Sequence, residues 1–314
     1  MVKKISKLVV VPVDGSESSL KSLAYLHLMF GSAHNLKVCA LYVLPSLPPI
    51  LVEEARKNRE TANQLKEIEI RNTRLAERVL EDAKQFLQEK GFAEDRIQTV
   101  YEKRKVDTAS DICVFTENKQ ADALVLSTRG RSRLVAFFMG ETANKVLEHH
   151  RYCPVWMVKG SVKKKNILIA LDNSENSLRA VDHAGFMLAG TDAKVTLFHT
   201  KRSLRRFVPK EIFESAPELE ELWKTKAGQE ILPVLAKAKE MLLKAGVPKS
   251  NVSTKIIDGS RSIVNDILSE AHSGRDGTIV LGRHGSADVN DFRMGDVARK
   301  VLENASDMAM WIVV

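Results

Sequence analysis

Two glycine-rich loops carry the residues best suited to chemistry. The segment GRHGSADVNDFRMGD at 282–296 places glycines at 282, 285 and 295, and it begins at the end of the apolar run GTIVLG. Glycines let backbone N–H groups approach a phosphate closely, and the N-terminus of a following helix adds a partial positive charge. The loop is therefore expected to bind the phosphates of a nucleotide.

The segment STRGRSRLVAFFMGE at 127–141 repeats this pattern with one glycine missing. Gly130 and Gly140 correspond to the later two glycines of the second loop, at a constant offset of 155 residues. Ser127 stands where the second loop has its first glycine, and its side chain is expected to restrict the turn. The recurrence of the loop in both halves indicates a site and not an accidental turn.

An acid follows the first expected strand of each half. Asp14 ends the run KLVVVPVD, and Asp172 ends KNILIALD. In an open parallel sheet, ligands bind beyond the carboxyl ends of the strands, where the strand order reverses. If the first and fourth strands of each half are neighbours, the acid faces the glycine loop and can accept hydrogen bonds from a ribose hydroxyl or a base amine. This arrangement is the outline of a nucleotide pocket.

The elements that must position these residues form an internal repeat. The segment GETANKVLEHHRYCPVWMV at 140–158 aligns with GDVARKVLENASDMAMWIV at 295–313. Because KGSVKKKN at 159–166 has turn chemistry, we expect domains at 1–160 and 161–314. In each half, continuous apolar strands alternate with helices, which predicts an α/β fold with a parallel sheet covered on both faces.

One expected helix is too long for its domain. From residue 52 to residue 90 it would extend about 55–60 Å, and its apolar positions keep helical spacing only from Leu65 onward. The segment 53–64 has almost no apolar face. We expect it to project, to break or to pack against a partner chain, and a solvated extension is the open alternative.

Composition limits the classes of function. The chain has 314 residues, 44% hydrophobic and 28% charged, as in globular proteins, and no apolar run approaches the roughly 20 residues of a membrane span. Cys39, Cys113 and Cys153 form no CxxC pair, which favours the reducing cytoplasm. The net charge of +8 is spread among 40 acids without a nucleic-acid-binding signature. We expect no specific nucleic acid and no membrane as partner.

Two histidine-containing segments are interpreted as structural. In EHHRYC at 148–153, the adjacent histidines would point about 100° apart on a helix, so they do not easily share one metal ion. His199, in the run TLFHT, is expected to be a hydrogen-bonded residue at a strand end and not a catalytic base. No metal ligands and no catalytic residues are assigned.

The order of elements, the aspartate after the first strand and the G-x2-G-x9-G loop resemble the universal stress protein family of the tandem type. The resemblance covers nearly the whole chain. It implies two doubly wound domains, each with a five-stranded parallel sheet of order 3-2-1-4-5 and helices on both faces. The domains would pack through their last strands as an internal pseudo-dimer, and a homodimer stays open. Some family members bind ATP through G-x2-G-x9-G-(S/T), and others have lost the motif and bind none.

The resemblance also implies which residues bind the nucleotide. In the second half they are Asp172, Gly282, Arg283, His284, Gly285, Gly295 and Asp296. In the first half they are Pro12, Asp14, Ser127, Gly130, Gly140 and Glu141. The acid, with Pro12 in the first half, lies on the adenosine side and the glycines on the phosphate side. His284 stands where some ATP-binding relatives have a histidine, and the arginines around both loops would offset phosphate repulsion.

Both halves depart from the family pattern at its hydroxyl position, which is occupied by Glu141 and Asp296. A carboxylate at a helix N-terminus is stabilised by the helix dipole, so it can occupy the anion site itself. At about 4 Å it repels a phosphate charge by roughly 1 kcal/mol in water and about 4 kcal/mol at an effective dielectric of 20. A Mg²⁺ ion that bridges carboxylate and phosphates would reverse this effect.

Three functions remain open from the sequence. The first is a cytoplasmic stress-response protein that acts by binding and association, with ATP, and Mg²⁺ with it, bound in the C-terminal domain. The second is a structural or interaction module in which Glu141 and Asp296 plug degenerate sites and no nucleotide binds. The third is a slow nucleotide hydrolase, for which the sequence offers no identifiable base.

Overall fold

The computed structural model describes residues 6–31, 35–128, 140–201, 208, 217–258, 262–285 and 294–314. The chain forms two compact units. The first comprises residues up to 127 together with 140–153, and the second continues from residue 154 to the last residue. Each unit is an α/β assembly in which apolar strands form the centre and amphipathic helices cover them.

The first unit contains parallel strands in the order β3-β2-β1-β4. The strands are β1 (Lys7–Pro12), β2 (Leu36–Leu44), β3 (Ile97–Lys103) and β4 (Ala123–Thr128). The helices are α1 (Glu17–Phe30), α2 (Pro49–Ala55), α3 (Arg59–Glu89), α4 (Thr108–Asn118), α5 (Glu141–His149) and the short 3-10 helix η1 (Glu94–Arg96). Helix α1 packs against α3 and α4 against α5. Right-handed crossovers in this strand order place the two pairs on opposite faces of the sheet.

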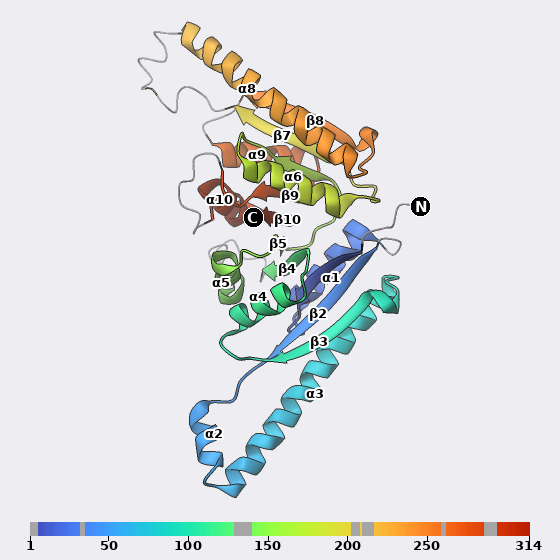
Figure 1. Ribbon diagram of the computed structural model, residues 1–314, viewed down its shortest axis with the longest axis vertical. Helices are drawn as coiled ribbons and strands as arrows, with labels where there is room; N and C mark the ends of the chain where they lie inside the picture. The colour runs from blue at the N-terminus through green and yellow to red at the C-terminus, as the bar shows by residue number, and fades with distance from the viewer. Residues whose placement is uncertain are drawn as a thin grey trace. The chain divides into compact units, whose positions relative to one another are not determined.

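The expected long helix is broken. Helix α2 ends at Ala55 and α3 begins at Arg59, because the side chain of Asn58 caps α3 and accepts hydrogen bonds from the N–H groups of Glu60 (2.8 Å) and Thr61 (3.3 Å). The prediction of a break is confirmed, and a single helix from residue 52 to residue 90 is wrong. Figure 1 shows α2 beside the first turns of α3, beyond the end of β3.

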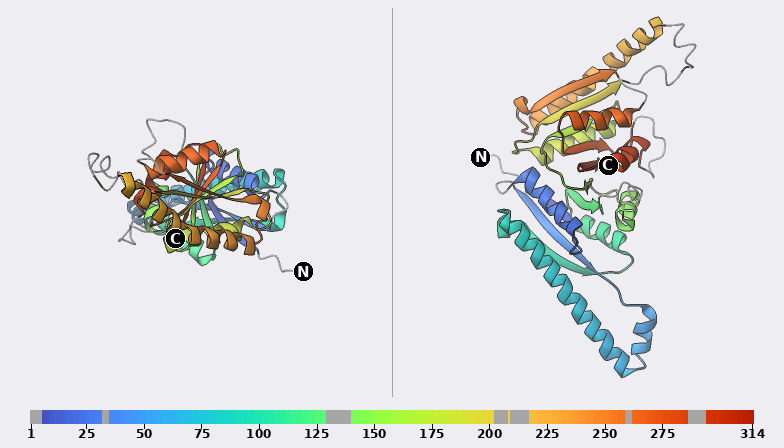
Figure 2. Two further views of the ribbon diagram at one scale, coloured as in Figure 1. Left: turned by 90° about the horizontal axis from the view of Figure 1, so that it is seen from above. Right: turned by 180° about the vertical axis from the view of Figure 1, so that it is seen from behind.

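The second unit contains strands in the order β5-β10-β9-β6-β7-β8. The strands are β5 (Val155–Lys159), β6 (Ile167–Ala170), β7 (Val195–Lys201), β8 (Val252–Asp258), β9 (Thr278–Gly282) and β10 (Ala309–Val313). The helices are α6 (Glu175–Leu188), α8 (Pro217–Lys244), α9 (Ile263–Ser273), α10 (Asp296–Asn304) and the 3-10 helix η3 (Lys249–Asn251). Strands β6 to β10 form the parallel order 3-2-1-4-5 that the resemblance implied. Helix α8 runs alongside β7 and β8 (Figure 2, right).

Strand β5, the last strand of the first repeat, pairs antiparallel with β10, the last strand of the second. Trp156 lies opposite Trp311, and their rings stack at 3.9 Å with 4° between the planes. The indole N–H of Trp156 donates to Nε2 of His183 at 3.1 Å, and burial lowers the pKa of His183 to about 3. The histidine therefore stays neutral and accepts this bond. The last strands of the two repeats therefore pair within the second unit, as the resemblance implied.

Candidate functional site

A cavity of about 390 Å³ lies in the second unit, at the carboxyl ends of β6, β7 and β9. This volume is in the range of small-molecule sites. Strands β6 and β9 are hydrogen-bonded neighbours, and the chain leaves them in opposite directions along the sheet, through α6 to β7 and through α10 to β10, so the cavity lies where the strand order reverses. Its wall contains all the residues that the resemblance assigned in the second half: Asp172, Gly282, Arg283, His284, Gly285, Gly295 and Asp296.

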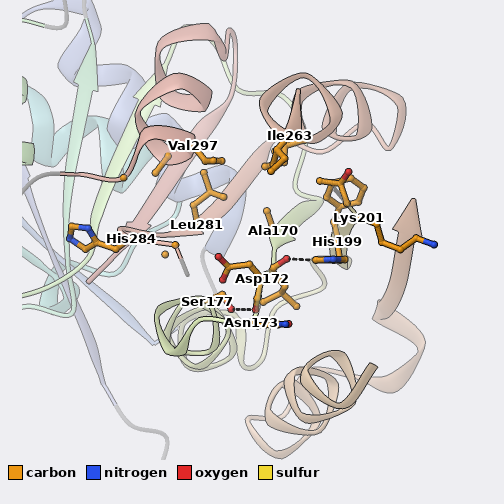
Figure 3. Close-up of a pocket in the computed structure, with 18 of the residues that line it drawn as sticks. Ala170, Asp172, Asn173, Ser177, His199, Lys201, Ile263, Leu281, His284 and Val297 are labelled. Carbon is orange, nitrogen blue, oxygen red and sulfur yellow. Dashed lines mark hydrogen bonds between the residues drawn. The ribbon is translucent and has the colours of Figure 1, made fainter. Parts of the chain in front are cut away.

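Asp172 is held by the turn that starts α6. Its Oδ1 accepts hydrogen bonds from the N–H of Ser174 at 3.0 Å and from the hydroxyl of Ser174 at 2.5 Å. Its Oδ2 faces the glycine loop, because a Cβ built on Gly285 would lie 3.0 Å from it. Figure 3 shows Asp172 between His284 and His199. The acid and the loop thus face each other, as expected if the first and fourth strands of the half are neighbours.

The ends of the glycine loop are fixed by close backbone contacts. A Cβ on Gly282 would lie 2.9 Å from the carbonyl carbon and oxygen of Asn176, so only glycine lets β9 approach the first turn of α6 this closely. The N–H of Arg283 donates to the carbonyl of Val313 at 2.6 Å, and its own carbonyl accepts from Gly295 at 2.8 Å. Arg283 is 1% exposed, so this arginine is part of the packed wall of the cavity.

Helix α10 begins after a glycine. Its N-cap is Gly295, which has no side chain that could cap the first-turn amides. The carboxylate of Asp296 instead pairs with Arg299 and with Lys300, both at 3.2 Å, and its side chain is 72% exposed. Hydrogen bonds from Arg299 and then Lys300 lower the pKa of Asp296. The carboxylate therefore lies along its own helix, and this geometry does not support the hypothesis that Asp296 plugs the site.

Glu141 in the first repeat behaves in the same way. Helix α5 has Gly140 as N-cap and no side-chain cap, and Glu141 pairs with Lys145 at 2.8 Å with a side chain that is 83% exposed. Neither carboxylate binds the first-turn amides of its helix. Sequence position alone suggested a plug, because it does not show which of several nearby partners a flexible acidic side chain selects.

Of the other candidate residues in the first half, only some lie in the described part of the structure. Pro12 ends β1, Asp14 accepts a hydrogen bond from the N–H of Ser16 at 3.0 Å, and Ser127 lies within β4. Gly130 and the arginines at 129, 131 and 133 lie outside the described residues. The described part of the chain therefore shows the acid and the strand ends of this half but not its loop.

The wall opposite the glycine loop was missed by the sequence analysis. It comes from the end of β7, from α8 and from α9, and it includes Phe198, His199, Lys201, Trp223, Lys226, Glu230, Ile263 and Ile267. Nδ1 of His199 lies 2.8 Å from the carbonyl of Leu171, and because a carbonyl can only accept, Nδ1 donates. The expected hydrogen-bonded histidine at a strand end is confirmed. For the residues of this wall on α8, the one available indication was the length of that helix, which spans Pro217–Lys244.

Other candidate segments have structural explanations. In the segment 148–153, Nε2 of His150 lies 3.3 Å from Sγ of Cys153, and burial raises the pKa of this thiol to about 12. Within the described ranges, no group of three or more His, Cys, Asp and Glu side chains is placed to hold a metal ion. A search of the same residues found no helix that is both long and apolar enough to span a membrane.

Comparison with known proteins agrees with the fold. The model of the Universal stress protein family matches residues 6–159 and 164–310. A universal stress protein of Methanocaldococcus jannaschii is 27% identical over 162 residues, which is 52% of this chain and 87% of that protein. The structure resembles that of a universal stress protein from Archaeoglobus fulgidus, with a TM-score of 0.67, 19% identity and 98% of both chains covered. A putative universal stress protein from Pseudomonas aeruginosa gives a TM-score of 0.57 at 14% identity, covering 99% of this chain and 94% of the other.

Proposed function

The chain belongs to the universal stress protein family, and we propose that it is a cytoplasmic stress-response protein that acts by binding and association, with an adenine nucleotide bound in the second unit. The observation that carries the proposal is the cavity itself. It joins the carboxylate of Asp172, the glycines that follow β9 and the start of α10 after its N-cap Gly295 in one wall. These are the groups that a ribose and a chain of phosphates require.

The phosphates would lie against Gly285, Gly295 and the first turn of α10. The first N–H groups of a helix have no partner within the helix, and the helix dipole favours an anion there. Asp172 would accept hydrogen bonds from the ribose through Oδ2, since Oδ1 is already used by Ser174. Asp296 is the carboxylate positioned to share a Mg²⁺ ion with the phosphates, because Mg²⁺ prefers one or two carboxylates together with phosphate oxygens.

The cysteines support the cytoplasmic part of the proposal. Cys39, Cys113 and Cys153 are unpaired thiols, and burial raises the pKa of the first two to about 11. Buried, protonated thiols are typical of proteins in a reducing compartment.

The test is to purify the protein without added nucleotide, denature it and chromatograph the supernatant for adenine nucleotides. Thermal unfolding is then measured with and without Mg-ATP. Ligand at 100 times its dissociation constant adds about 2.7 kcal/mol, which raises the melting temperature by about 5–10 °C for a unit of this size. The proposal would be contradicted if no nucleotide co-purified and Mg-ATP did not raise the melting temperature.

Two variants locate the effect in the cavity. Gly285→Ala places a methyl group 3.0 Å from Oδ2 of Asp172, and we expect it to abolish the ATP-induced shift. Gly228→Ala, at a glycine of α8 that lies between Lys226 and Glu230 but is not itself part of the lining, is the matched control and should keep the shift. Asp296→Ser removes the carboxylate that would share the Mg²⁺ ion, so we expect it to weaken Mg-ATP binding. Binding that is instead about two- to tenfold tighter, the gain from a hydroxyl donor worth about 0.5–1.5 kcal/mol, would show that Asp296 opposes the phosphates.

A further inference from the structure

One face of helix α8 forms the far wall of the cavity. Trp223, Lys226 and Glu230 all line it, and their spacing of three and four residues places them on the same side of the helix. Two isoleucines of α9, Ile263 and Ile267, line the same end. The cavity therefore has glycines and a helix N-terminus at one end, and at the other an aromatic and aliphatic surface beside the charged side chains of Lys226 and Glu230.

The aromatic residue belongs to the second repeat alone. Helices α3 and α8 end alike: the carbonyl of Leu87 accepts from Phe92, and the carbonyl of Leu242 accepts from Val247, both at 3.0 Å. This register, an offset of 155 residues, places Trp223 at the position of Ile68. The two helices therefore correspond in the two repeats, and at this position α3 has an isoleucine where α8 has a tryptophan.

We infer that Trp223 supplies the stacking surface for the base of the bound nucleotide and that the cavity selects a purine nucleotide. The inference rests on the proposed function. Phosphates favour the glycine end, because the α10 amides and the helix dipole lie there. The base then reaches toward β7 and α8, where Trp223 and the two isoleucines of α9 supply apolar surface among charged side chains. An indole stacks on the face of a flat ring, and the larger purine ring covers more of it than a pyrimidine.

Trp223 also gives the site its own optical signal. The other two tryptophans, Trp156 and Trp311, are 0% exposed and stacked on each other between β5 and β10. Trp223 is half-buried and lines the cavity. Quenching of tryptophan fluorescence by a bound purine should therefore come from Trp223.

The experiment titrates the full chain with ATP, with CTP and with inorganic tripolyphosphate by calorimetry, and follows fluorescence in parallel. Trp223→Ile installs the residue of the first repeat, and Trp223→Phe keeps an aromatic ring. Leu222→Ala, at an exposed neighbour outside the cavity lining, is the matched control. Circular dichroism melting checks that every variant is folded.

We expect Trp223→Ile to weaken ATP binding by about 5- to 150-fold, the range of one base–aromatic stack, and to leave tripolyphosphate binding within twofold. Trp223→Phe should bind ATP within about threefold of the wild type, and neither variant should show the ATP-dependent quench. The wild type should bind ATP more tightly than CTP.

Three results would overturn the inference. Equal ATP affinity in Trp223→Ile and the wild type would remove Trp223 from the base site and leave the proposed function intact. Equal losses for ATP and tripolyphosphate, without rescue by Trp223→Phe, would assign the tryptophan a structural role. Absence of ATP binding to the wild type would overturn the proposed function and the inference together.

Discussion

Replacing Gly282 by alanine is expected to destabilise the second unit. A Cβ at this position would lie 2.9 Å from the carbonyl carbon and oxygen of Asn176 and 3.0 Å from its Cβ, whereas ordinary contacts of a Cβ begin at 3.4 Å. Asn176 belongs to the first turn of α6, so its backbone cannot retreat by about half an ångström without displacing the helix. Overpacking of this kind costs about 1–3 kcal/mol.

This cost can be measured as a melting temperature. For a repeat of about 150 residues, each kcal/mol lowers the melting temperature by roughly 2–4 °C, so Gly282→Ala should melt about 2–12 °C below the wild type. Circular dichroism or calorimetry in the absence of nucleotide measures this directly. The first repeat has Ser127 at the corresponding position, within β4, so the requirement for glycine is a property of the contact with α6 and not of the strand.

The matched control is Gly140→Ala. Among the described residues, no atom lies within 4 Å of a Cβ at Gly140. Its φ of −52°, like the −58° of the equivalent N-cap Gly295, is accessible to alanine. We expect this variant to melt within about 2 °C of the wild type. If Gly282→Ala melted as little changed as the control, the close approach of β9 to α6 would not be the reason for the glycine.

Three further predictions concern stability. Trp156→Phe should cost about 1–3 kcal/mol in urea unfolding, because it removes the hydrogen-bond donor to His183 inside the protein; an unchanged midpoint would contradict this. Burial, and then the charge of Glu270, raises the pKa of Asp276 from 3.8 to about 6. The folded state therefore holds this proton more tightly than the unfolded state, and the contribution of Asp276 to the free energy of unfolding falls as the pH rises from about 4 to 6. Asp276→Asn should flatten this pH dependence and be more stable than the wild type at pH 7, whereas the same slope in both proteins would exclude Asp276 as its source. Gly228→Ala should raise the free energy of unfolding by about 0.5–1 kcal/mol, because alanine is favoured over glycine in a helix interior. The new Cβ would lie 3.8 Å from Cδ of Lys201, an ordinary contact distance, and a lower melting temperature would refute this prediction.

The repeat, the order of strands and helices, and the positions of the acid and the glycines at strand ends could all be predicted from the amino-acid sequence. These features depend on the periodicity of apolar residues and on turn chemistry, which are local properties. Asp172 and Gly285 could be expected to meet because both follow strands that become neighbours in an open parallel sheet. The β5–β10 pairing followed from the family resemblance and not from the residues.

The partners of the side chains at these positions could not be predicted, because they depend on packing between distant parts of the chain. Asp296 lies along its helix toward Arg299 and Lys300, although the helix dipole would also stabilise its carboxylate at the first-turn amides. Trp223 reaches the cavity because α8 extends past the sheet and packs on β7, a contact between residues far apart in the chain. Local pattern places a residue on an element, and packing between distant elements selects its partners.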